Sequence, residues 1–136
     1  MTPEDRLLLV RRRMRQARDT LIQAEALAGI SQWPGVVNRA YYAMFYAALA
    51  LLLARGLRTR KHSGALALID REFVRPGCCH ASRPTHLRKA FSLRQDSDYD
   101  EASDITRDQA QTLLADSSTF VATVVETLQR LQTPPE

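Results

Sequence analysis

The chain has 136 residues, a length typical of one domain, and its 45% hydrophobic and 25% charged residues exclude a disordered or fibrous protein. Its 19 basic and 15 acidic residues give a net charge of +4, which permits a phosphate-bearing partner without requiring one. We therefore predict a single domain over residues 1–136. Acidic residues precede the first apolar run and arginines follow it, the reverse of a secretory signal, so we expect a cytoplasmic protein.

The first predicted helix ends near Gly29. Its apolar residues alternate spacings of three and four, as on one face of a helix, and they are Leu7, Val10, Met14, Ala17, Leu21, Ala24 and Ala28. Six arginines also occur between Arg6 and Arg18, and they cannot all point in one direction. Most are expected to form a solvated face. A nucleic-acid footprint is the alternative, because phosphate-binding surfaces concentrate arginine.

A second helix is predicted from near Val36 to near Gly56, after a break at Trp33–Gly35. Within it, Ala40–Ala54 is a run of fifteen residues without a charge. This run is shorter than the roughly 20 apolar residues that a membrane-spanning helix needs, so no membrane association is predicted. A helix that is apolar on most of its circumference is expected at the centre of the fold, with the other helices around it.

Polar side chains on this second helix are more than a buried helix requires. Arg39, Tyr42 and Tyr46 are three and four residues apart and share one stripe, and Asn38 lies one turn below Tyr42. In one interpretation the tyrosines bury their rings and expose their hydroxyls, while Arg39 binds a backbone carbonyl. In the other, Arg39 and the hydroxyls line a polar pocket that binds a phosphate or a nucleobase.

Two further helices are predicted in the middle of the chain. The third ends at Pro76-Gly77, and its apolar residues at helical spacing are Leu66, Ile69 and Phe73. The fourth is expected to start at Ser82 and Pro84, because serine caps helices and proline is tolerated in the first turn. Its predicted inner residues are Leu87, Ala90 and Phe91. The following segment, residues 95–104, is predicted to be a loop.

The last helix is predicted to begin after Thr106, which has capping-box spacing to Gln109. Its predicted buried stripe consists of Ala110, Leu114, Ser117, Val121, Val124, Leu128 and Leu131. No segment alternates with period two for long enough to predict a strand. The predicted fold class is all-α, an up-and-down bundle of about five helices. Heptad-like seams favour near-antiparallel packing of the long helices, or a dimer interface made from one of them.

Arg94 is a second unusual polar group. It lies three residues after Phe91 and seven after Leu87, which places it toward the inner side of the fourth helix. Burying a guanidinium alone is costly. Two interpretations fit: an ion pair with Asp98, four residues later, or a phosphate bound at Arg94.

A metal site is not predicted. The potential ligands that cluster in the sequence are Cys78, Cys79, His80 and His86. Neighbouring cysteines lack the gap of two to four residues that lets both thiolates reach one metal. The sequence also contains no phosphate-binding loop, dinucleotide fingerprint or nucleophile-elbow motif, so no cofactor is predicted.

Three segments, taken in order, resemble the HEPN domain family. They are N-R-A-Y-Y-A-M-F-Y-A-A from Asn38, R-K-H-S-G-A-L at residues 60–66 and L-R-Q-D-S-D-Y-D at residues 93–100. The resemblance runs from Asn38 to Leu128 and is to the small stand-alone HEPN proteins encoded beside minimal nucleotidyltransferases. It implies an all-α homodimer that binds RNA or a nucleotide and forms a toxin–antitoxin pair with a nucleotidyltransferase.

The resemblance also implies a chemistry. Many members are metal-independent endoribonucleases whose signature is an arginine followed four to six residues later by histidine. The histidine exchanges protons and the arginine stabilises charge on phosphorus as the RNA 2′-hydroxyl attacks the adjacent phosphate. Here Arg94 is followed by Asp98 and Tyr99 instead of histidine. His62, in the R-K-H-S-G segment, is the candidate substitute.

Two versions of the function follow from this resemblance. In the enzymatic version Arg94 stabilises the phosphorane, His62 or Tyr99 transfers protons, and Arg39 positions the phosphate. In the other version a catalytically inactive bundle uses the same groups to hold a nucleotide, or acts as a scaffold for the nucleotidyltransferase. A purely structural bundle, with Arg39 and Arg94 as ion-pair anchors, is the third interpretation.

Further residues receive roles through the same resemblance. Asn38, Tyr42 and Asp98 are the remaining candidates for binding the phosphate of a nucleotide or RNA. Tyr99 also matches the tyrosine to which the nucleotidyltransferase adds a nucleotide in some two-gene systems of this family. An adduct there would add negative charge and bulk beside Arg94.

Overall fold

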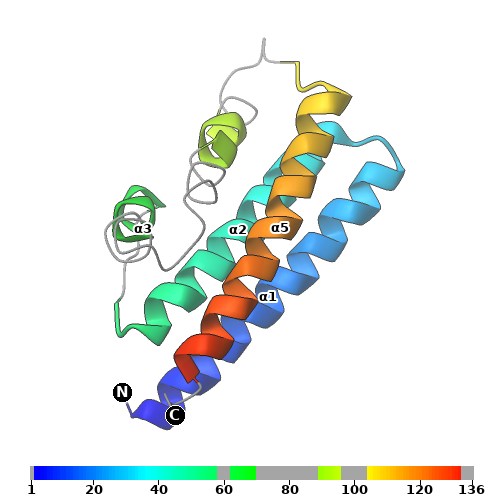
Figure 1. The fold of residues 1–136 in the computed structure, drawn as a ribbon. Coiled ribbons are helices and arrows are strands. Elements are labelled where there is room, and N and C mark those ends of the chain that lie inside the picture. The colour runs from blue at the N-terminus through cyan, green and yellow to red at the C-terminus, as the bar shows by residue number, and fades with distance from the viewer. Residues whose placement is uncertain (1, 58–61, 70–88, 96–103, 133–136) are drawn as a thin grey trace.

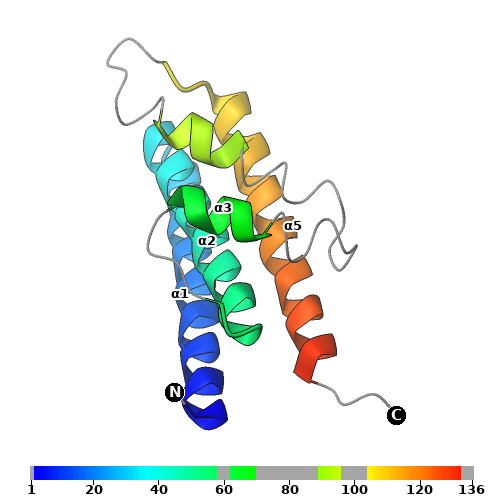
Figure 2. The same cartoon turned by 90° about the vertical axis from the view of Figure 1, so that its left-hand side faces the viewer.

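Helices make up nearly all of the part of the chain that the structure describes. The computed structural model describes residues 2–57, 62–69, 89–95 and 104–132. The three long helices are α1 (Pro3–Gly29), α2 (Trp33–Ala54) and α5 (Arg107–Gln132), and α1 runs antiparallel to the other two (Figure 1). A short helix, α3 (His62–Ile69), and a helical segment at 89–95 lie beside α2 (Figure 2). No strand occurs within these ranges, and the predicted all-α class is confirmed.

Side-chain caps define where the outer two long helices begin. At α1 the Thr2 hydroxyl accepts a hydrogen bond from the Asp5 amide, and the Asp5 carboxylate accepts one from the Thr2 amide. At α5 the predicted capping box is confirmed: the Gln109 amide donates to the Thr106 hydroxyl over 3.1 Å, and the Thr106 amide donates to Gln109 Oε1 over 3.0 Å. Each box satisfies amides that have no partner within the helix.

The start of α2 differs from the prediction. The helix begins at Trp33 rather than near Val36, so the Trp33–Gly35 segment forms its first turn instead of a break. Pro34 is tolerated there because the amides of a first turn have no partner within the helix. Gly35 lies against α1, where an added Cβ would come within 3.0 Å of the Leu27 Cδ1 atom. The chain turns just before, at Ser31, whose φ is 57°.

The core is centred on α2, as predicted. The fully buried alanines of this helix are Ala40, Ala43, Ala47, Ala48 and Ala50. These small side chains allow α1 and α5 to pack close to the α2 backbone. On α5 the buried Ser117 hydroxyl donates a 2.8 Å hydrogen bond to the Ala40 carbonyl, which satisfies a polar group at the helix contact. The predicted stripe of α1 is buried at Val10, Met14, Ala17 and Ala24.

The predicted stripe of α5 is correct in its middle and wrong at its end. Ser117, Val121, Val124 and Leu128 are buried, whereas Leu131 is 40% exposed in the last turn. Three buried residues were not predicted: Leu113 at 4%, Phe120 at 3% and Thr127 at 2% exposure. The buried face of α5 is therefore wider than a strict seam, because it packs against both α2 and α1.

By length and composition, α2 could cross a membrane, since it has 22 residues and is largely apolar. However, most of its apolar stretch is buried inside the protein, and the core helix of a soluble protein has the same properties. Its packing against both α1 and α5 agrees with the predicted core helix. The predicted end of the third helix, the start of the fourth and most of the loop after it lie outside the described residues.

Candidate functional site

Aromatic side chains cover the side of α2 that meets the 89–95 segment. Tyr41, Tyr42 and Phe45 contact one another, with the Tyr41 and Tyr42 ring centroids 5.2 Å apart in an edge-to-face arrangement. Phe91 packs on Tyr41, with 5.9 Å between ring centroids. Tyr46 extends the row, with its centroid 6.0 Å from that of Tyr42. Such aromatic pairs contribute stabilisation in addition to that from the apolar area they bury, so they help to fix the side chains on this side of α2.

Arg94 lies on that surface. Its guanidinium carbon is 5.4 Å from the ring centroid of Tyr41 and 5.4 Å from that of Tyr42. The side chain is half-buried, in agreement with its predicted position on the inner side of the fourth helix. A guanidinium at this distance from an aromatic ring is attracted by about 0.5–2 kcal/mol, more as water is excluded. The rings of Tyr41 and Tyr42 therefore hold the Arg94 guanidinium, whose inward position is predicted from the sequence spacing alone.

Arg39 reaches the same ring from within α2. Its guanidinium carbon lies 5.3 Å from the Tyr42 centroid. The Nε and Nη2 atoms of Arg39 both donate to the Asn38 Oδ1 atom, over 2.9 and 2.7 Å, and Nη1 donates to Gln23 Oε1 on α1 over 3.4 Å. Its hydrogen bonds to described residues therefore go to side-chain oxygens, and not to the backbone carbonyl of the first of the two interpretations. Asn38 orients the guanidinium.

Tyr41 was not predicted as part of a site. Its side chain is 1% exposed, and this burial raises the pKa of its hydroxyl, an effect that the nearby Arg94 cation partly opposes and Tyr42 adds to. The hydroxyl therefore stays protonated at neutral pH. The available sequence signal was the pair of adjacent tyrosines, Tyr41 and Tyr42. Adjacent helix residues point about 100° apart, so one of the pair faces the core while the other faces the edge of the core.

Four of the predicted site residues come together in space. Asn38, Arg39 and Tyr42 of α2 meet Arg94 of the 89–95 segment, and with Tyr41 they form what we call the arginine–tyrosine cluster. This is a pair of guanidiniums that share the ring of Tyr42. Guanidiniums recognise phosphates through paired hydrogen bonds, and tyrosine rings can stack on nucleobases.

The other predicted residues are not placed against the cluster. His62 is the first residue of α3, and its side chain lies outside what the structure describes. Asp98 and Tyr99 also lie outside the described residues, as do Cys78, Cys79, His80 and His86. Within the described ranges, no group of three or more histidine, cysteine, aspartate or glutamate residues could hold a metal ion.

Comparison with known proteins identifies relatives along most of the chain. A family model described as HEPN domain matches residues 10–128. A UPF0332 protein of Thermotoga maritima is 33% identical over 118 residues, which cover 87% of this chain and 89% of that protein. The UPF0332 protein glr0978 of Gloeobacter violaceus is 35% identical over 129 residues, or 94% and 98% of the two chains. A protein of Methanocaldococcus jannaschii named "Putative toxin MJ0142" is 31% identical over 106 residues, covering 78% of this chain and 72% of its own.

Proposed function

Because the chain belongs to the HEPN domain family, we propose that it is a toxin-like protein that binds a phosphate of RNA or of a nucleotide at the arginine–tyrosine cluster. Two relatives from Methanocaldococcus jannaschii are named "Putative toxin", which supports the first part of this proposal. The second part rests on one observation: Arg39 and Arg94, from separate segments, both lie over the ring of Tyr42.

The chemistry of this pair favours an anion. Two guanidiniums on one ring repel each other, and an anion between or beside them lowers that repulsion. A phosphate oxygen can accept hydrogen bonds from both, and its charge makes each bond stronger than a neutral one. Tyr46 offers an aromatic ring next to that position, where a base attached to the phosphate could stack. Nucleotides and RNA supply both groups.

In the enzymatic version of this function, Arg94 stabilises the negative charge that builds on phosphorus when the 2′-hydroxyl attacks. Arg39 and Asn38 hold the phosphate, and the proton carrier is His62 or Tyr99. Tyr41 does not serve as that carrier, because its side chain is 1% exposed and is not accessible to a substrate. The described side chains of the cluster are asparagine, arginine and tyrosine, which equally suit an inactive member that only binds a nucleotide or supports its partner.

The proposed setting is a two-protein system. The partner is a minimal nucleotidyltransferase encoded nearby, this chain acts as a homodimer in the cytoplasm, and Tyr99 is the residue that the partner modifies. Expression of the chain alone and then with its neighbour, with growth and RNA integrity scored, tests this setting. Mass spectrometry of the co-expressed chain locates any adduct, and modification at another residue, or none, would exclude the proposed role of Tyr99.

Arg94→Ala tests the site itself. We expect cleavage of a labelled single-stranded RNA, or affinity for ATP in the non-enzymatic version, to fall by about 100-fold, as when one donor to a developing anion is removed. Arg12→Ala is the matched control, because Arg12 is exposed on α1 and belongs to no part of the cluster. A variant that is destabilised but keeps its activity per folded molecule would show that Arg94 is a structural anchor.

A further inference from the structure

A second set of arginines lies on the outer face of α1. Residues on that face alternate spacings of three and four, and they are Leu8, Arg11, Arg15, Arg18 and Ile22. All five are exposed, and the apolar residues at the two ends, Leu8 and Ile22, are each 62% exposed. We call these five residues the arginine stripe. At the helical rise it extends over about 21 Å.

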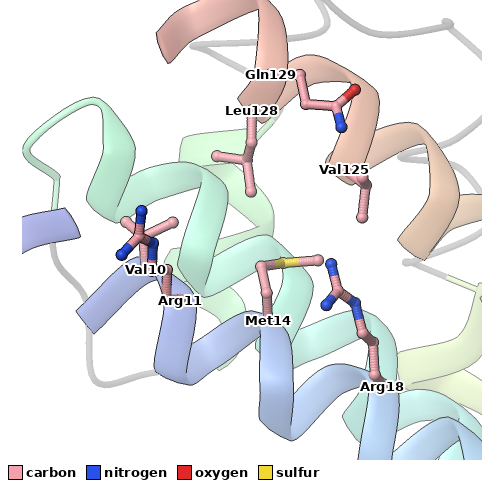
Figure 3. Close-up of a pocket in the computed structure, with 7 residues that line it drawn as sticks. All are labelled: Val10, Arg11, Met14, Arg18, Val125, Leu128 and Gln129. Atoms are coloured by element: carbon pink, nitrogen blue, oxygen red, sulfur yellow. The ribbon is translucent and has the colours of Figure 1, made fainter. Parts of the chain in front are cut away.

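A groove between α1 and α5 borders this stripe. Figure 3 shows the guanidinium groups of Arg11 and Arg18 on either side of the Met14 side chain, with Leu128 and Val125 facing them from α5. The groove encloses about 200 Å³, and Val10 and Gln129 complete its lining. The groove therefore combines apolar side chains from both helices with two cations from α1.

We propose that the arginine stripe and the adjoining groove dock an acidic amphipathic helix of another protein. Carboxylates at the spacing of Arg11, Arg15 and Arg18 would meet the three cations, and apolar residues at the two ends would cover Leu8 and Ile22. Recognition of an amphipathic helix through anchors at such spacing is a recurrent mode of helix-in-groove binding. Within the described ranges, none of the three arginines forms an ion pair or a side-chain hydrogen bond that would compete with this partner.

A second copy of this chain is a poor occupant of the stripe. The stripe is nearly symmetric about Arg15, so an antiparallel pairing with itself would place Arg15 opposite Arg15 and bring Arg11 within one residue of the position opposite Arg18. Like charges opposite each other across an interface disfavour that pairing. The proposed partner is therefore a different protein that carries negative charge where this chain carries the three arginines.

Phosphate surfaces fit the stripe less well than an acidic helix does. A nucleic-acid backbone would use the three arginines but leave the exposed Leu8 and Ile22 without apolar partners. A membrane surface needs a continuous apolar face on the helix, whereas here three arginines separate the two apolar residues. The combination of apolar ends and a cationic middle is what distinguishes a helical protein partner.

The test uses the full chain and a synthetic helical peptide of about 20 residues, long enough to be helical when alanine-rich. The peptide carries glutamates at the spacing of the three arginines and leucines at the spacing of Leu8 and Ile22. We expect Arg11→Glu/Arg18→Glu to weaken peptide binding, measured by fluorescence anisotropy, by about tenfold or more. A peptide with lysine in place of each glutamate should bind this variant better than the unmodified chain.

Matched variants show whether the loss of peptide binding is due to the residues of the arginine stripe. Arg12→Glu/Arg107→Glu makes the same change in charge at exposed positions outside the stripe and should leave peptide affinity unchanged. Leu8→Ser/Ile22→Ser should weaken peptide binding several-fold. It should not change the binding of a labelled single-stranded RNA or of vesicles that contain phosphatidylserine. Arg94→Ala should not change peptide binding, so failure of the phosphate site and failure of this proposal are distinguishable.

Two results would overturn the proposal. One is equal binding of the acidic peptide to the unmodified chain and to the Arg11→Glu/Arg18→Glu variant. The other is binding of RNA or vesicles that depends on the stripe arginines and exceeds peptide binding, which would assign the surface to phosphates.

Discussion

The arginines of this protein occupy two contrasting environments. In the arginine–tyrosine cluster, Arg39 and Arg94 are half-buried on the ring of Tyr42, and Asn38 orients one of them. On α1, the arginines of the stripe are exposed and extend from the helix surface. A guanidinium held by a ring and an amide loses less freedom when it binds a ligand than an exposed one does. The first environment suits a small, defined ligand, and the second suits an extended and adaptable contact.

The largest difference between the two regions should appear in stability. Tyr41 is 1% exposed and packs against Tyr42, Phe45 and Phe91, so Tyr41→Ala should lower the free energy of unfolding by about 3–5 kcal/mol, as for other large core side chains. Arg15→Ala, on the exposed stripe, should change it by no more than about 0.5 kcal/mol. Urea unfolding followed by circular dichroism measures both. Equal effects would remove the structural distinction between the two regions.

A smaller effect should appear at high pH. Burial raises the pKa of Tyr41 in the folded chain, so above the ordinary tyrosine pKa of about 10 the unfolded chain loses that proton while the folded chain keeps it. Stability due to this group is therefore complete below pH about 10 and falls as pH rises further, by up to about 1.4 kcal/mol per pH unit. Tyr41→Phe should reduce that slope.

The control for this pH effect is Arg15→Ala, which leaves every tyrosine hydroxyl in place. Its unfolding free energy should keep the slope of the unmodified chain, when both are measured by urea unfolding between pH 9 and 11, a window about the ordinary tyrosine pKa. A slope that survives in Tyr41→Phe would mean that another group titrates there.

Local patterns allowed much of the fold to be predicted. The α5 capping box depends on Thr106 and Gln109 alone, and the stripe of α1 depends on helical spacing, so both could be read from neighbouring residues. The predicted start of α2 was wrong because Pro34 and Gly35 break a helix in its interior but are accepted in its first turn. The exposure of Leu131 depends on where the bundle ends, and the spacing of apolar residues along the helix does not predict that position.

The site was predictable only in its parts. Spacing placed Arg39 and Tyr42 on one stripe and Arg94 on an inner face, but their meeting depends on how the 89–95 segment packs on α2. Tyr41 was missed because it is off that stripe and contributes as a buried support. The hydrogen bonds from Arg39 to Asn38 join adjacent residues, which helical periodicity does not consider as a pair.

A double-mutant cycle between Arg39 and Arg94 tests the central claim most directly, namely that the two guanidiniums serve one phosphate. The affinity for ATP, or the rate of RNA cleavage if the chain cleaves RNA, is measured for the unmodified chain, Arg39→Ala, Arg94→Ala and the double variant. If both arginines bind the same anion, the losses are non-additive and the coupling is about 0.5–3 kcal/mol. Additive losses, or no loss in either single variant, would contradict a shared site.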